Sequence, residues 1–229
     1  MNNLRMGSRD PEVILLQRLL NEALVRVRPA VFLDEDGRFG PNTDRVLRQF
    51  QAQARGPTGP LAVDGVAGPT TWRALGLVTE VVTRIAPIGQ TTDMSCWAVS
   101  AGVATGRMSS DRPVTAQLGR DMGLRPDLPN LDLFARECGM RLMNHVPMTV
   151  QSLLPFLRQG PIMLGGEFPG TGARHLVAIT GYYAGPSEYT TMIRINDPDP
   201  VGSGSISVTD YPSMTLRAGQ FDPYALIVR

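Results

Sequence analysis

The segment from Gln90 to Ala101 contains the residue type best suited to nucleophilic catalysis. Cys96 directly precedes a run of small and apolar residues that extends to about Ala104, and this run predicts a buried helix with Cys96 at its N-terminus. An ordinary cysteine, with a pKa of about 8.5, is only a few per cent thiolate at neutral pH. The positive end of a helix dipole and a neighbouring imidazolium both favour the thiolate. We therefore predict that Cys96 is a nucleophile and that the Gln90 side chain donates an N–H to a developing oxyanion.

A nucleophilic cysteine needs a base, and the predicted one is His175. Residues 174–183 have the pattern of a buried strand that begins close to His175, and residues 189–195 that of a second strand, which ends at Asn196 and Asp197. A hairpin of these strands brings the imidazole beside an acceptor that orients it toward the thiol. Side chains alternate along a strand, and Asp197 falls on the face that carries isoleucines. We predict Asp197 as the third catalytic residue, with Asn196 as the alternative.

Each of these residues also has a structural interpretation. Cysteine is among the most buried residue types, and a Cys96–Cys138 disulfide would make both cysteines structural. Cys138 ends a helical-looking stretch and is expected in the core. His145 is the alternative base, although no strand pattern surrounds it. Asp197 could instead cap a turn before Pro198. The order of Gln, Cys, His and Asp along the chain favours the catalytic interpretation.

The N-terminal third of the chain contains an internal repeat. The segment Asp36–Thr43, DGRFGPNT, is answered by Asp64–Thr71, DGVAGPTT. Each copy predicts a glycine-rich turn that leads into a helix, because Pro suits the first helical turn and Thr helps to cap it. Apolar residues at helical spacing follow each copy, and a further amphipathic helix is expected over residues 13–24. Three short helices with ordered turns predict a compact module.

This repeat resembles the widespread bacterial peptidoglycan-binding module. The resemblance covers nearly all of residues 4–76 and is specific because many separated positions agree in order. The agreeing residues are Leu4, Gly7, Val13, Leu16, Gln17, Leu20, Asn21, Asp36, Gly37, Phe39, Gly40, Pro41, Thr43, Val46, Phe50, Gln51, Val63, Asp64, Gly65, Gly68, Pro69, Thr71, Trp72 and Leu75. The chain departs from the usual pattern at the arginine- and proline-rich residues 25–33 and in a longer connection at 53–60. The resemblance implies peptidoglycan as a partner.

The remainder of the chain resembles papain-like cysteine peptidases. Over about residues 86–229 it has their order of Gln90, then Cys96 and a Trp on a helix, then His175 on a strand, then Asn or Asp after the next strand. Its Cys-Trp-Ala, His-Leu-Val and Asn-Asp-Pro tripeptides are most similar to those of the bacterial branch that contains bacteriocin-leader peptidases and plant-pathogen effector proteases. In that branch the third member is usually the Asp of an Asp-Pro pair, which corresponds to Asp197. The resemblance implies a helix bearing the Cys, packed against an antiparallel β-sheet.

We therefore predict an α+β chain of two domains. A small three-helix peptidoglycan-binding domain is expected at 1–78, an extended linker at 79–88 and a papain-like domain at 89–229. Together they indicate a wall-targeted cysteine hydrolase that cleaves an amide bond in peptidoglycan, within the stem peptide or between stem and sugar. A wall-anchored protease acting on proteins, and a binding protein with an inactive site, are the alternatives.

Composition excludes several other classes of function. The formal net charge is +1, which leaves no basic field for nucleic acid. All 22 basic residues are arginine, so lysine Schiff bases, Ser-Lys dyads and P-loop lysines are excluded. The two histidines and two cysteines form neither an H-E-x-x-H nor a C-x-x-C pair, and we expect no metal and no organic cofactor.

The first residues lack the apolar core of a secretory signal, and no apolar run approaches the roughly 20 residues of a membrane span. We therefore expect no membrane insertion and synthesis in the cytoplasm without a signal peptide. Action at the wall or periplasm would then follow from a secretion system or from phage lysis. The first route would make the chain an antibacterial effector, a toxin with a cognate immunity protein as partner; the second would make it a phage lysin. We expect a monomer.

Overall fold

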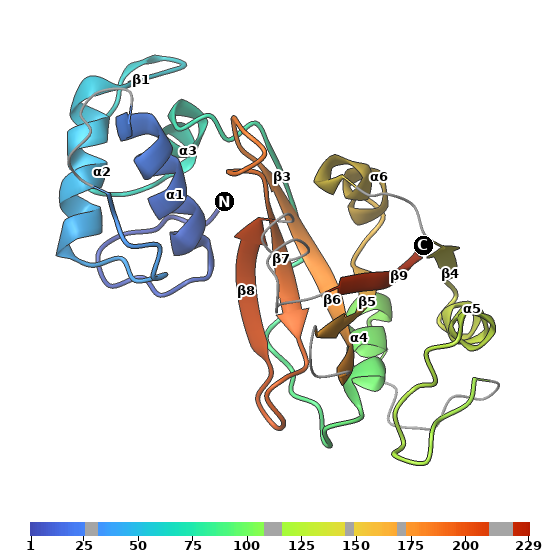
Figure 1. Ribbon diagram of the computed structural model, residues 1–229. Coiled ribbons are helices and arrows are strands. Elements are labelled where there is room, and N and C mark those ends of the chain that lie inside the picture. The colour runs from blue at the N-terminus through green and yellow to red at the C-terminus, as the bar shows by residue number, and fades with distance from the viewer. Residues whose placement is uncertain (26–31, 108–115, 145–148, 169–172, 211–221) are drawn as a thin grey trace. The chain divides into compact units, whose positions relative to one another are not determined.

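The computed structural model describes residues 1–25, 32–107, 116–144, 149–168, 173–210 and 222–229. The backbone divides into two compact units, of which the first comprises 1–80, 183–192 and 208–210 and the second comprises the rest. The chain combines helices with a large β-sheet and has a helical N-terminal region, which confirms the predicted α+β class (Figure 1). The predicted domain boundaries stay predictions.

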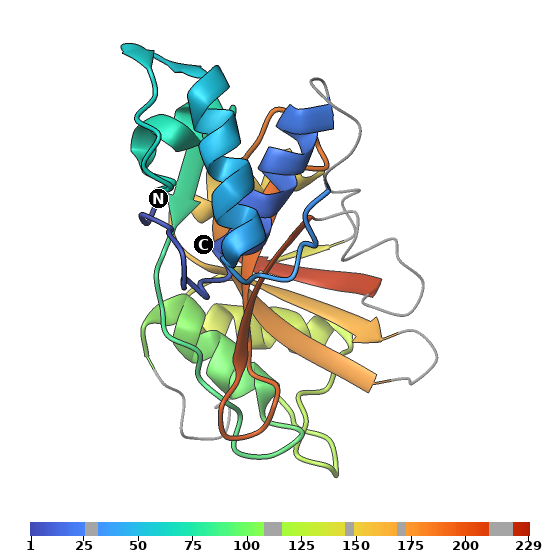
Figure 2. The same ribbon diagram turned by 90° about the vertical axis from the view of Figure 1, so that its left-hand side faces the viewer.

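The N-terminal part of the first unit contains the three predicted helices. They are α1 (Glu12–Val25), α2 (Pro41–Gln53) and α3 (Pro69–Ala74), accompanied by the short paired strands β1 (Arg55–Gly56) and β2 (Gly59–Pro60). Helices α2 and α3 each begin with a proline that follows an extended glycine, as the repeated Gly-Pro signal predicts. Helices α1 and α2 lie side by side (Figure 2). Their buried faces supply leucines and valines to a common core.

Both copies of the sequence repeat fold into the same hydrogen-bonded turn. In the second copy the buried Gln51 side chain donates to Asp64 Oδ1 at 2.9 Å and accepts from the Gly65 N–H at 3.0 Å. In the first copy the equivalent residues are Gln17, Asp36 and Gly37, with distances of 2.8 and 3.0 Å. The two glycines have φ of +69° and +71°, the left-handed conformation that glycine adopts without strain. In each copy a buried glutamine on the preceding helix therefore holds the turn.

We expect Gln51→Leu to lower the free energy of unfolding by about 2–4 kcal/mol, because it leaves the Gly65 N–H and the Asp64 carboxylate without their buried partner. The matched control is Gln53→Leu on the exposed side of the same helix, which should change stability by less than about 0.5 kcal/mol. Urea unfolding of both full-length variants measures the difference. Equal stability of the two variants would show that the glutamine does not support the turn.

The second unit is built on most of the large sheet. Among the described residues this sheet has seven strands in the order β4-β9-β5-β6-β7-β8, with β3 paired to β6 outside that path. The strands are β3 (Thr79–Val82), β4 (Arg141–Asn144), β5 (Ile162–Phe168), β6 (Ala173–Ala184), β7 (Met192–Asp197), β8 (Ser205–Asp210) and β9 (Asp222–Val228). Strand β5 runs antiparallel to both β6 and β9. The segment expected as an extended linker therefore contains a strand of the sheet.

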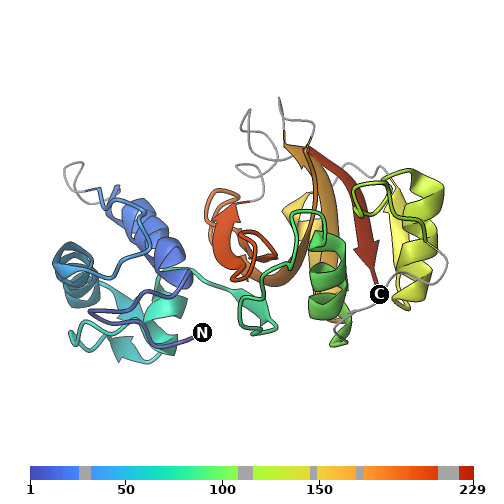
Figure 3. The same cartoon turned by 90° about the horizontal axis from the view of Figure 1, so that it is seen from below.

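Helix α4 (Cys96–Thr105) packs against the sheet, as Figure 3 shows. Its residues are mostly small, so the helix axis can lie close to the strands. The fully buried Ser100 hydroxyl donates to the main-chain oxygen of Leu176 on β6 at 2.7 Å, which fixes the helix against that strand. Trp97 packs edge-on against Phe134 of α5 (Leu128–Glu137) at 6.0 Å between ring centroids. Two shorter helices, η1 (Val150–Leu153) and α6 (Leu154–Leu157), precede β5.

Candidate active site

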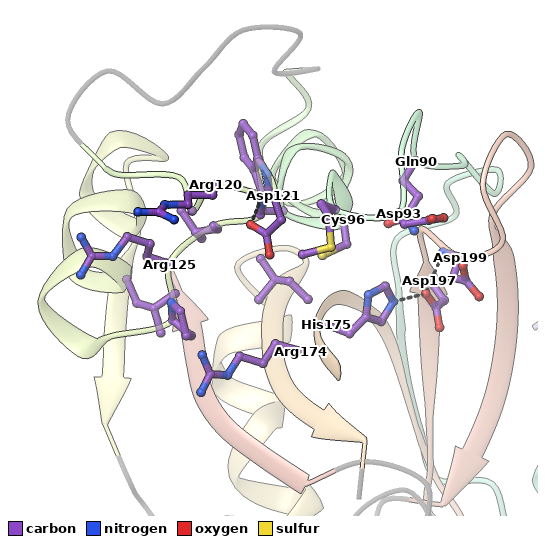
Figure 4. A pocket seen from close by; sticks show the side chains of 18 residues that line it. Gln90, Asp93, Cys96, Arg120, Asp121, Arg125, Arg174, His175, Asp197 and Asp199 are labelled. Atoms are coloured by element: carbon purple, nitrogen blue, oxygen red, sulfur yellow. Dashed lines mark hydrogen bonds and ion pairs between the residues drawn. The ribbon is translucent and has the colours of Figure 1, made fainter. Parts of the chain in front are cut away.

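A pocket of about 820 Å³ in the second unit brings together the four residues predicted to form a catalytic site. Cys96 is the first residue of α4, His175 lies near the start of β6, Asp197 ends β7, and Gln90 lies in the segment before α4. Figure 4 shows all four side chains around the pocket. Their roles in catalysis stay predictions, and the geometry below describes how they meet.

Cys96 is held at the start of its helix by the turn that precedes it. The Ser95 hydroxyl oxygen accepts the main-chain N–H groups of Thr91 and Thr92 at 3.1 and 3.0 Å. The Cys96 side chain follows at the positive end of the helix dipole and is buried. Because the Ser100 hydroxyl fixes α4 to β6 beside His175, the sulfur and the imidazole are brought together by two packed elements.

The His175 ring lies between the Cys96 sulfur and the Asp197 carboxylate (Figure 4). Its Nε2 is 2.5 Å from Asp197 Oδ1, which leaves Nδ1 for the hydrogen bond to the Cys96 side chain. The same Asp197 oxygen accepts the Asp199 main-chain N–H at 2.9 Å, so the carboxylate is itself held in position. Opposite His175 on β5 stands Gly166, which has no side chain to compete for that face of the sheet. The result is a Cys-His-Asp chain of contacts.

The same contacts decide the charge of His175. Burial by itself lowers the pKa of the imidazole. The hydrogen bonds to Asp197 and Cys96 and the negative charges of both raise the pKa by more than burial lowers it, so that it reaches about 10. At neutral pH the ring is therefore an imidazolium. An imidazolium beside a cysteine is the partner that stabilises a thiolate, and it also holds a proton ready for a leaving group.

This raised pKa predicts a pH dependence of stability. The folded pKa of His175 lies above the ordinary value of 6.5, so its contribution to stability is complete below about pH 6.5 and is lost as the pH rises toward 10. We expect the unfolding free energy to fall over this range, by at most about 1.4 kcal/mol per pH unit. The slope should be smaller in Asp197→Asn, which removes the carboxylate charge. Urea unfolding at several pH values measures both slopes, and equal slopes would contradict the coupling.

Asn196, the alternative to Asp197, belongs to a different set of contacts. Its Oδ1 accepts from the Thr180 hydroxyl at 2.8 Å and from Arg194 Nη1 at 2.9 Å. Its Nδ2 donates to the main-chain oxygens of Ile85 and Ala86 at 3.2 and 3.3 Å. These bonds join the segment before the pocket to the sheet, and they bury the amide away from His175. Asp197, and not Asn196, is the residue in contact with the imidazole.

Gln90 is fixed through its main chain. Its N–H donates to Pro198 O at 2.9 Å, and its carbonyl oxygen accepts the Gly202 N–H at 2.8 Å. The residue is 3% exposed, and its side-chain Oε1 is buried with no hydrogen-bond partner among the described residues. A buried polar atom without a partner costs about 1–3 kcal/mol. Gln90 also lines the pocket, and the group that a substrate oxyanion would need from it is the Nε2 donor, not this acceptor.

The other candidates from the sequence are placed differently. Cys96 and Cys138 are both free, so the disulfide considered from the sequence is not formed. Burial and the neighbouring Glu137 raise the pKa of the Cys138 thiol to about 11, which keeps it protonated at neutral pH. Cys138 packs against the core cluster that contains Trp97, in agreement with its predicted core role. His145 lies outside the described residues.

Sequence reasoning missed the charged residues that line the rest of the pocket. Asp93, Arg120, Asp121, Arg125, Arg174 and Asp199 all border it. The adjacency of Arg174 to His175 and of Asp199 to Asp197 was a usable signal for two of them. The segment that carries the other two arginines has no periodic pattern, and long-range hydrogen bonds of Asn130 hold it. Those bonds could not be read from the sequence.

No helix in the described part of the chain combines the length and the hydrophobicity needed to cross a bilayer. Over the same residues, no three His, Cys, Asp or Glu side chains gather as a metal site would need.

Comparison with known proteins gives one family match and a partial structural likeness. Residues 9–75 match the family model described as "Putative peptidoglycan binding domain". No curated protein matches the chain. Among solved structures, the crystal structure of a Burkholderia AP3 phage endolysin is 31% identical over 44% of this chain and 34% of its own, with a TM-score of 0.27. This chain thus spans about a third of the length of that endolysin chain. The family match agrees with the peptidoglycan-binding module predicted for residues 4–76.

Proposed function

We propose that this chain is a peptidoglycan-targeted cysteine hydrolase of the papain-like type, which cleaves an amide bond in the bacterial cell wall. The observation that carries the proposal is the His175 imidazole held between the Cys96 side chain and Asp197 in an accessible pocket. That site occurs on a chain whose N-terminal residues match a peptidoglycan-binding family.

The first half of the proposed reaction forms an acyl-enzyme. The Cys96 thiolate attacks the carbonyl carbon of the amide, a bond between sulfur and carbon forms, and the carbonyl π electrons move to oxygen. The Gln90 side chain and the main-chain N–H of Cys96 stabilise that oxyanion. When the oxyanion collapses, the C–N bond breaks, and the leaving nitrogen takes the His175 proton. A thioester on Cys96 and a free amine result.

Water completes the proposed reaction. His175, now neutral, removes a proton from a water molecule while the water oxygen attacks the thioester carbon. Collapse of the second oxyanion breaks the bond between sulfur and carbon, which returns the Cys96 thiolate beside the imidazolium and releases a carboxylic acid. Asp197 keeps the ring in the orientation that both steps need.

The two parts of the chain divide the work in this proposal, with a peptidoglycan-binding domain at 1–78, a linker at 79–88 and a hydrolase domain at 89–229. Docking on glycan raises the local concentration of substrate and leaves the bond-breaking step unchanged. We further propose that the chain acts as a monomer at the wall or in the periplasm. An antibacterial effector with an immunity protein and a phage lysin are the two settings that fit a wall hydrolase.

Purified sacculi and a denatured protein, each incubated with the full-length chain, test the proposal. We expect soluble wall fragments whose masses show hydrolysis of one kind of amide bond, and no such products from the Cys96→Ala variant. Cleavage of the denatured protein with intact sacculi would instead support a wall-anchored protease. Inactivity on both substrates would leave a binding protein, and would contradict the proposed hydrolase.

A further inference from the structure

The main chain of Gln90 is bound to the turn that follows β7. This turn comprises residues 198–204. Gln90 donates its main-chain N–H to Pro198 O at 2.9 Å, and its carbonyl oxygen accepts the Gly202 N–H at 2.8 Å. The two bonds reach the beginning and the later part of the turn. A displacement of the turn therefore moves the main chain of Gln90 with it.

The same turn holds the acid of the candidate site. The Asp199 main-chain N–H donates to Asp197 Oδ1 at 2.9 Å, on the oxygen that also contacts His175. The Asp199 carbonyl oxygen in turn accepts the Ser205 hydroxyl at 2.9 Å, which ties this part of the turn to the start of β8. The turn therefore supports the acid as well as the predicted oxyanion donor.

The close approach of the two segments depends on two glycines. A Cβ atom at Gly89 would overlap main-chain atoms of residues 202–204. A Cβ atom at Gly204 would lie 2.5 Å from Ile88 O and 3.0 Å from Asp197 O. Gly204 also has a φ of +60°, the left-handed conformation that glycine adopts without strain. Because the obstructing atoms belong to the main chain and not to flexible side chains, a methyl group at either position must push the segments apart.

The segment that contains Gly89 is anchored on both sides of this glycine. Upstream, the Asn196 side chain donates to the main-chain oxygens of residues 85–86. Downstream, the Ser95 hydroxyl oxygen accepts the main-chain N–H groups of residues 91–92. Crowding at Gly89 therefore cannot be relieved by a slide of the whole segment. The displacement falls on the predicted oxyanion donor and on the turn that holds the acid.

We propose that Gly89 and Gly204 are positioning residues for the reaction at Cys96. Neither glycine is among the described residues that line the pocket, so they act through Gln90 and Asp197. Their missing side chains permit the main-chain contact that sets the oxyanion donor and the acid at their places around the nucleophile and the base. This inference rests on the proposed function and deepens it, because it assigns the geometry of two predicted catalytic residues to one contact.

The kinetics of Gly89→Ala test the proposal, with muropeptides released from sacculi by a muramidase as the soluble substrate. We expect kcat to fall about 10–100-fold, the loss that a misplacement of about 1 Å causes in a catalytic geometry. KM should change less than about twofold, because the residues that line the pocket stay the same. In a Gln90→Ala background the same substitution should lower kcat far less, since one group through which it acts is already gone.

Gly139→Ala is the matched control, because Gly139 has a φ of +66° and a Cβ atom there would meet nothing within 4 Å. It should lose stability in urea and keep the wild-type kcat. If Gly89→Ala does not fold, Ser205→Ala loosens the same turn without crowding and should lower kcat about 2–10-fold, the range for one hydrogen bond.

An unchanged kcat in a folded Gly89→Ala or Ser205→Ala protein would overturn the positioning role while leaving the hydrolase intact. The same would follow if Gly89→Ala caused equal losses of kcat with and without the Gln90 side chain. A wild-type chain that hydrolyses neither sacculi nor muropeptides would overturn the proposed function and the positioning role together.

Discussion

Replacement of Cys96 by alanine is expected to lower kcat on sacculi by at least about 10⁴-fold, since no other thiol and no hydroxyl side chain lines the described pocket. The substitution removes one sulfur atom at the rim of the core, so the fold should persist. Cys138→Ala is the matched control because its thiol packs in the core and stays protonated. That variant should retain most of the wild-type kcat. The rate at which soluble wall fragments are released measures the activity of the wild type and of both variants.

Alkylation tests by a second measurement the prediction that Cys96 is the nucleophile. Iodoacetamide at neutral pH should modify Cys96 far faster than Cys138, because the thiolate is the reacting form and the raised pKa of Cys138 suppresses it. Peptide mapping by mass spectrometry assigns the modified residue. Wild-type hydrolysis by Cys96→Ala, or preferential modification of Cys138, would show that the sulfur at position 96 has no catalytic role.

The second large effect separates Asp197 from its neighbour in sequence. Asp197→Asn should lower kcat by about 10²–10⁴-fold, because the imidazole loses the carboxylate that orients it and that raises its pKa. Asn196→Ala should instead lower the free energy of unfolding by about 2–4 kcal/mol, because it removes a buried amide that accepts from Arg194 and Thr180 and donates to two main-chain oxygens. Its kcat per folded molecule should change much less.

Activity and urea unfolding measured on both variants give the comparison. We expect Asp197→Asn to lose mainly kcat and Asn196→Ala to lose mainly unfolding free energy. A larger loss of kcat in a fully folded Asn196→Ala protein would assign the orienting role to the amide and would contradict the chain of contacts described above.

The sequence predicted the elements that have strong local signals. The repeated Gly-Pro dipeptides marked the starts of α2 and α3, and the run of small residues after Cys96 marked α4. The alternation at the end of β7 favoured Asp197 over Asn196 as the neighbour of His175, and this is the contact that the structure has. These features depend on residues close together in the chain, where propensity and periodicity act.

Features that depend on contacts between residues far apart in the chain could not be predicted from the sequence. The segment at residues 79–88 was expected to be extended, and its first residues form β3. The sequence did not show that this strand pairs with β6, about a hundred positions away. The segment that carries Arg120 and Arg125 is held by the side chain of Asn130. No local sequence pattern predicts these contacts. The set of charged residues around the pocket follows from these long-range contacts and could not be predicted from the sequence.

The most direct test of the account is the mass of the peptide that contains Cys96 after the chain is mixed with sacculi and quenched in acid. We predict an added acyl group from the wall on that residue, which hydroxylamine removes and which is absent from Cys96→Ala. Hydrolysis of sacculi by Cys96→Ala at the wild-type rate, with the Cys96 peptide of the wild-type chain unmodified, would contradict it.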